Sequence, residues 1–129
     1  MTNVSISRIL ENFGLSVNKL DPRRSLRFAI KYFKNKPIKV IEIGVEGGKN
    51  SKMLLDNLNI NRIYLIDPYI IYDDLFLIAN ERDKTNQFFN HKKIIAEKRL
   101  SKYKDKIDWI RKLSDDAVKD IKEKVDYIY

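Results

Sequence analysis

The chain has 129 residues and a formal net charge of +8, because 26 Lys and Arg residues outnumber 18 Asp and Glu residues. Its length fits one domain, and 43% hydrophobic with 34% charged residues is typical of a folded protein with one core rather than of a disordered chain. The absence of cysteine excludes a disulfide framework, a zinc–thiolate site and a cysteine nucleophile, and the single histidine excludes a His-rich metal site.

Two helical patterns open the chain. Apolar residues at helical spacing predict a helix over residues 4–13. Asp21-Pro22 is typical of a helix start, and an apolar stripe predicts a second helix that continues to about Lys34. We therefore expect residues 1–37 to form an N-terminal helical segment.

A β-α-β unit is predicted over residues 38–67. Residues 38–43 form a short, β-branched, nearly continuous apolar run, which is typical of a buried parallel strand. A helix is expected from about Gly48 to Leu58, and a second strand over residues 62–66. A unit of this length implies a right-handed crossover and parallel strands.

The rest of the chain is expected to continue this alternation. Residues 69–90 are ambiguous, with a helical stretch starting over residues 75–79. The patterns that follow predict, in order, an amphipathic helix from Lys92 to about Tyr103, a strand over residues 107–110, a helix opened by Ser114 and a strand over residues 125–129. Residues 38–129 are thus expected to form one α/β domain with a parallel sheet.

A glycine-rich turn joins the first predicted strand to its helix. Gly44, Gly47 and Gly48 let the backbone approach a ligand there, and ligands bind beyond the carboxyl ends of parallel strands. The turn does not match G-x-G-x-x-G, because residue 46 is Glu, and it does not match G-x-x-x-x-G-K-[ST], because residue 43 is Ile and residue 50 is Asn. Glu46 also argues against a pyrophosphate on this turn.

Two carboxylates mark the ends of the first two strands. Glu42 lies at the end of the first, and Asp67 follows the second, 25 residues later. A carboxylate at the position of Asp67 can accept both hydroxyls of a ribose. The sequence therefore predicts a nucleoside-containing ligand at this edge of the sheet.

Three segments resemble a known family. Residues 40–51 resemble the first motif of class I S-adenosylmethionine-dependent methyltransferases, in the variant that reads roughly E-I-G-x-x-x-G-x-S. Residues 63–69 resemble the second motif, and residues 109–115 fall where the family brings its third strand to the adenine. The resemblance covers roughly residues 38–129 and implies S-adenosylmethionine as the cofactor.

The resemblance also implies roles for single residues. Glu42 would help to hold the methionine end of the cofactor, directly or through water, and Asp67 would bind the ribose hydroxyls. Ser114, with Asp115 or Leu113, would border the adenine. The remaining residues of the implied cofactor site are those of the first motif, Gly44, Gly48 and Ser51, of which the glycines give room and pack the helix. The catalytic residue is not among these positions.

The fold that the resemblance implies is a Rossmann-like methyltransferase fold, with helices on both faces of a parallel sheet ordered 3-2-1-4-5-7-6. Residues 125–129 resemble its fourth strand, which in this subgroup usually continues into I-D-G-x-H. The chain would then be the cofactor-binding half of a larger domain, truncated after strand 4. We expect the fourth strand, as an exposed edge, to cause homo-oligomer formation or poor solubility.

Three functions follow as hypotheses. The first is a methyltransferase that acts on an oxygen of a small molecule or sugar-like hydroxyl. The second is a non-catalytic fragment or remnant of that fold, which acts as a binding or assembly module. The third is an RNA-binding or RNA-modifying protein, but 18 of the 26 basic residues are Lys scattered among acids, so we do not expect a nucleic-acid partner.

Apolar runs remain short throughout the sequence. None of them nears the ~18 residues that a membrane-spanning helix needs. We therefore expect a cytoplasmic protein with no membrane partner.

Overall fold

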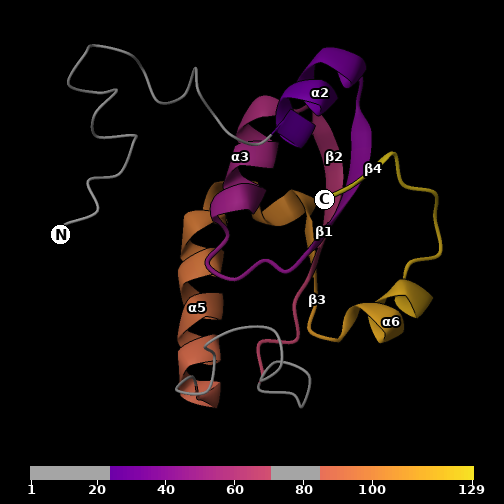
Figure 1. Ribbon diagram of the computed structural model, residues 1–129. Coiled ribbons are helices and arrows are strands. Elements are labelled where there is room, and N and C mark those ends of the chain that lie inside the picture. Colours follow the sequence, from indigo (N-terminus) through magenta and orange to yellow (C-terminus); the bar gives the residue numbers. More distant parts are fainter. Residues whose placement is uncertain (1–23, 71–84) are drawn as a thin grey trace, which may run out of the picture.

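The computed structural model describes residues 24–70 and 85–129. At its centre lies a four-stranded parallel sheet in the order β3-β2-β1-β4, which Figure 1 shows nearly edge-on. The strands are β1 (Ile38–Ile43), β2 (Ile60–Ile66), β3 (Ile107–Ile110) and β4 (Tyr127–Ile128). The α/β class, the parallel sheet and the strand order 3-2-1-4 are confirmed.

Helices cover both faces of the sheet, as predicted. On one face lie α2 (Arg24–Phe33), α3 (Lys49–Asn57) and α5 (Asn86–Arg99), and on the other lies the short helix α6 (Ser114–Ala117), followed by η4 (Val118–Asp120). The predicted helix over residues 4–13 and the helical stretch at residues 75–79 lie outside the described residues. No helix of the described ranges is long and apolar enough to cross a membrane.

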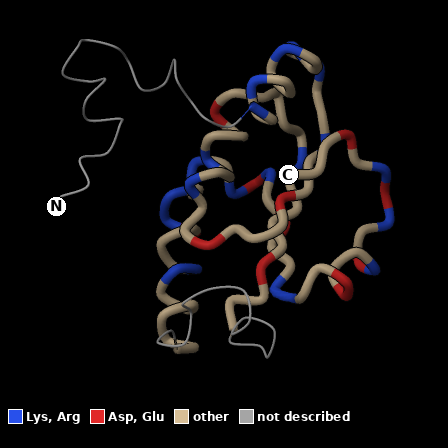
Figure 2. Tube along the Cα trace, viewed as in Figure 1, with Lys and Arg blue, Asp and Glu red and all other residues tan. Residues whose placement is uncertain are grey.

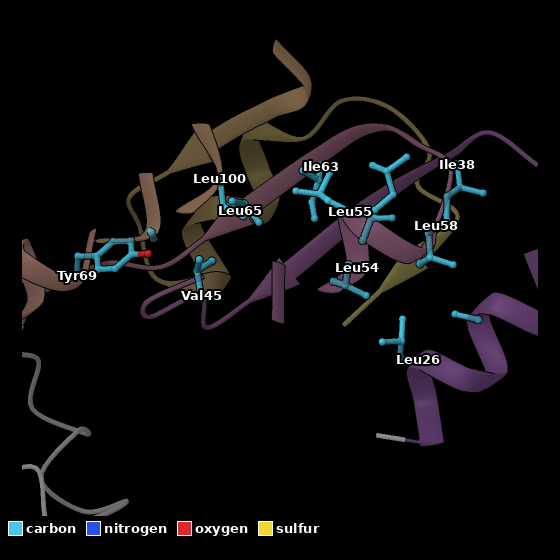
Figure 3. Close-up of a cluster of buried hydrophobic side chains, with 14 residues drawn as sticks. Leu26, Ile38, Val45, Leu54, Leu55, Leu58, Ile63, Leu65, Tyr69 and Leu100 are labelled. Atoms are coloured by element: carbon cyan, nitrogen blue, oxygen red, sulfur yellow. The ribbon is translucent and has the colours of Figure 1, made fainter. Parts of the chain in front are cut away.

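The larger core lies between the sheet and helices α2, α3 and α5 (Figure 3). Alternate residues of the central strands point into it, because side chains of a strand alternate between the two faces. Its largest fully buried side chains include Ile38, Leu54, Ile63, Leu65 and Leu100. The opposite face carries a smaller cluster built on Ile41, Ile66 and Ala117.

Several element boundaries differ from the predicted ones. Strand β2 begins at Ile60 rather than Arg62, because Ile60 pairs with Ile38 of β1. Helix α5 begins at Asn86, six residues before the predicted start, because the Oγ1 of Thr85 accepts a hydrogen bond from the N–H of Phe88 (3.3 Å) and caps the helix. The chain then tightens into the 3₁₀ helix η3 (Ser101–Lys106) where the sequence pattern predicts continuing α-helix.

Strand β4 is shorter than the predicted strand over residues 125–129. Its backbone bonds to β1 nevertheless extend to Tyr129, whose N–H donates to the C=O of Ile41 (2.8 Å) and whose C=O accepts from the N–H of Ile43 (3.0 Å). β1 is therefore held on both sides up to the point where the chain turns out of the sheet.

Candidate functional site

A cleft of about 200 Å³ lies beyond the carboxyl ends of β1, β2 and β3. Three residues of the predicted cofactor site line it together, Gly44, Asp67 and Ser114. The other lining residues are Ile43, Ile66, Pro68, Ile70, Phe89, Lys112 and Leu113. The strand order places the loops after these three strands side by side, so residues up to 71 positions apart in sequence, Ile43 and Ser114, meet at one opening.

Gly44 begins the turn that follows β1. Its φ of +84° lies in the region that favours glycine, and its N–H donates to the C=O of Ile66 (2.9 Å). A Cβ at this position would meet no heavy atom of the described residues within 4 Å, so the backbone faces the space beside the cleft. A ligand can therefore approach the backbone of Gly44 closely.

Asp67 joins the turn after β1 to the turn after β2. Its Oδ2 accepts a hydrogen bond from the N–H of Glu46 (2.9 Å), and its Oδ1 accepts one from the N–H of Tyr69 (2.9 Å). A carboxylate oxygen has two lone pairs, so each oxygen keeps capacity for a ligand hydroxyl. The half-buried carboxylate is thus held in one orientation at the edge of the cleft.

Tyr69 positions the turn beside the cleft, whereas the sequence left it open between a substrate lid and an ordinary surface loop. It is buried, with φ +50°, and its hydroxyl donates to the C=O of Glu46 (2.8 Å). Burial, with the nearby charge of Asp67, raises the pKa of Tyr69, so the hydroxyl stays a donor. Its place directly after Asp67-Pro68, within the second motif, was the available signal.

Replacing Tyr69 with phenylalanine tests this bond. The variant keeps the ring but leaves the C=O of Glu46 without its buried donor, so we expect a loss of about 1 kcal/mol in the free energy of unfolding. Urea denaturation measures the change, and Tyr32→Phe, at an exposed ring of α2, is the matched control with no expected change. Equal stability of the Tyr69→Phe protein and the parent would contradict this role.

Glu42 is fully buried at the end of β1 and does not line the cleft itself. The hydroxyl of Ser51 donates to its Oε2, while its Oε1 has no hydrogen-bond partner among the described residues. Burial raises the pKa of Glu42 to about 7, against the lowering effect of the Ser51 bond and with a smaller contribution from the charge of Asp67. The site therefore holds a carboxyl group with one unused polar atom.

Ser51 and Gly48 position the glycine-rich turn through contacts inside the protein. Ser51 is fully buried, and its hydroxyl is directed to Glu42 rather than to the cleft. Gly48, with φ +74°, is the N-cap of α3 and packs so closely on α5 that a Cβ would lie 3.2 Å from the Cβ of Ala96. These two residues of the first motif position the turn.

The loop after β3 completes the cleft. Ser114 is the first residue of α6 and lines the cleft, with Leu113 as the N-cap, whereas Asp115 is exposed and does not line it. Arg111 ties this loop to the one after β2, because its guanidinium donates to the C=O groups of Pro68 and Tyr69 (3.3 Å each). Arg111 is a second positioning residue, one that sequence reasoning did not single out.

Comparisons with protein-family models and with curated proteins found no significant match to this chain.

Proposed function

We propose that this chain binds S-adenosylmethionine and forms the cofactor-binding part of a methyltransferase that acts on an oxygen of a small molecule or sugar-like hydroxyl. The observation that carries this proposal is the placement of two carboxylates at the ends of adjacent parallel strands, Glu42 on β1 and Asp67 after β2, with the open Gly44 turn between them. The cytoplasmic location stays a prediction from the sequence.

The residues present fit this cofactor. The oriented carboxylate of Asp67 offers acceptors for the two ribose hydroxyls, and Leu113 and Ser114 border the space beside it. Glu42 has a buried Oε1 without a partner among the described residues, and a buried acceptor of this kind is stabilised by a donor such as an ammonium group or a water bound to it. The carboxylate of Asp67, which lines the cleft, also suits a ligand that carries positive charge.

The chemistry divides between the cofactor and the chain. When bound, S-adenosylmethionine supplies a methyl group activated on a sulfonium sulfur. The residues of this chain bind and orient, since methyl transfer depends on holding the acceptor oxygen in line with the activated carbon. Tyr69 joins the loop after β2 to the loop after β1, and Arg111 joins the loop after β3 to the loop after β2, so the cleft has its shape before a ligand enters.

Asp67→Asn tests the ribose assignment. The amide keeps the size of the side chain but removes the charge and one acceptor, so we expect binding of S-adenosylhomocysteine to weaken about ten- to a hundredfold, the loss of one charge-assisted hydrogen bond. Isothermal titration calorimetry on the full chain measures this affinity.

The matched control is Asp116→Asn, which removes the same charge from an exposed carboxylate that pairs with Lys119 (3.0 Å) outside the cleft. We expect its affinity to equal that of the parent. Binding that is equally tight in Asp67→Asn and the parent would overturn the ribose assignment, and a parent chain that binds neither S-adenosylmethionine nor its demethylated product would overturn the proposed function.

A further inference from the structure

A second groove, of about 320 Å³, lies on the other side of the glycine turn, between the start of α3 and the side of α5. We call it the basic groove, and its lining residues are Gly44, Val45, Glu46, Gly47, Lys49, Asn50, Lys92, Ile95 and Arg99. Of the described residues, Gly44 alone lines both this groove and the cleft described above. Its volume is at the lower end of the range of small-molecule sites, about 300–1,000 Å³.

Cations outnumber acids in this groove. Among the residues that the structure describes, Lys49, Lys92 and Arg99 face a single carboxylate, that of Glu46. The Nζ of Lys92 lies 2.9 Å from the Oε1 of Glu46, so this ion pair offsets the negative charge that the sequence places on the turn. The charges of Lys49 and Arg99 remain in excess. Figure 2 shows Lys and Arg residues on both α3 and α5, the two helices that form the groove.

Arg99 is held in a position to act as a donor. One guanidinium nitrogen, Nη1, donates to the C=O of Gly47, and a Cβ at Gly47 would lie only 3.2 Å from that nitrogen. A guanidinium carries five N–H donors in a planar fork, so this one bond leaves donors for the oxygens of an anion. The glycine at position 47 thus permits the close approach that fixes the guanidinium beside the groove.

The backbone adds to the positive field. Helix α3 begins at Lys49 after Gly48, an N-cap residue without a side chain that could cap the helix, and the N-terminus of a helix carries partial positive charge. The field at the groove therefore comes from side chains of two helices and from the backbone of one.

We propose that the basic groove binds a compact anion, a phosphate or a carboxylate group, either free or carried by a small molecule. The cations, the fixed guanidinium and the volume of the groove all match such a group. The proposal does not depend on the function assigned to the neighbouring cleft, because the two sites are lined by different polar side chains.

The test is a titration of the full chain with inorganic phosphate at low ionic strength, followed by amide chemical shifts in ¹H–¹⁵N NMR spectra. We expect shifts centred on Gly47, Lys49 and Asn50. The double variant Lys49→Gln/Lys92→Gln is expected to bind phosphate about tenfold more weakly, as expected when charge-assisted hydrogen bonds are lost.

The control variant Lys102→Gln/Lys104→Gln changes the net charge by the same amount in η3, outside the groove, and is expected to bind phosphate like the parent. Shifts spread evenly over the basic surface, or equal losses in both double variants, would overturn the proposal. Thermal unfolding of both variants verifies that they are folded.

A parallel titration with S-adenosylhomocysteine separates this proposal from the proposed function. That ligand is expected to shift the amides of Asp67 and Ser114, so each site can fail while the other succeeds. Phosphate that still binds at saturating S-adenosylhomocysteine identifies a site for a separate anion, and phosphate that is displaced identifies a subsite for an anionic group of the same ligand.

Discussion

Replacing Gly48 with alanine is expected to lower the free energy of unfolding by about 2–5 kcal/mol. Two effects add at this residue. A φ of +74° is strained for any residue with a Cβ, and the new Cβ would lie 3.2 Å from the Cβ and 3.3 Å from the Cα of Ala96. Helix α5 would have to move away from α3, which opens the larger core. Urea denaturation monitored by circular dichroism measures the loss.

Gly44→Ala separates the two effects. Gly44 has a similar φ of +84°, but a Cβ there would meet no heavy atom within 4 Å in the described part of the chain. We therefore expect only the backbone strain, about 1–2 kcal/mol. Equal losses in the two variants would show that the contact between α3 and α5 at Gly48 contributes nothing to stability.

The stability of the protein is expected to fall as the pH rises from about 4.5 towards 7, and Glu42→Gln is expected to remove this fall. Burial raises the pKa of Glu42 from its ordinary value of 4.5 to about 7. Between these two values the folded chain binds more protons than the unfolded chain, so the free energy of unfolding decreases with pH. A pKa shift of this size corresponds to a loss of about 3 kcal/mol in the free energy of unfolding, and the loss is complete once the pH exceeds 7.

The measurement compares urea denaturation at pH 5 and pH 8 for the parent and Glu42→Gln. The glutamine leaves a buried amide next to Ser51, so the absolute stability of the variant is not the readout. The readout is the difference between the free energies of unfolding at the two pH values. Glu46→Gln, at an exposed carboxylate, is the control and should keep the pH dependence of the parent. Parallel changes with pH in the parent and Glu42→Gln would contradict the raised pKa.

The strands were the part of the fold that local sequence predicted best. Strands β1 and β3 have the predicted bounds, because each is a short apolar run that ends where glycine or charged residues begin. The alternation of these strands with helices was enough to predict a parallel sheet, since a crossover that contains a helix joins parallel neighbours.

Helix ends were predicted less well. The start of α5 depends on the cap at Thr85, a signal that was present in the sequence but lay within an ambiguous stretch. The helical period of the sequence predicts neither the four-residue length of α6 nor the 3₁₀ conformation of η3.

Within the site, the sequence predicted which residues lie at the edge of the sheet but not what each one contacts. Gly44, Asp67 and Ser114 line the cleft, whereas Ser51 is turned inward to Glu42 and Asp115 faces solvent. A side chain at the first turn of a helix points either to the ligand or to the core, and only the packing of that helix on the sheet selects one.

By itself, then, the sequence determined the order of strands and helices and the two carboxylates at the ends of β1 and β2, because these depend on local periodicity and chain order. The tertiary structure decided the bonds between the loops, namely Asp67 to the amide of Glu46 and Tyr69 to its carbonyl, and the gathering of Lys49, Lys92 and Arg99 around a groove. Each of the two hydrogen bonds links residues more than 20 positions apart, and Lys49 precedes Lys92 by 43 positions. Such contacts form only when the sheet has brought the carboxyl ends of neighbouring strands, and the loops that follow them, side by side.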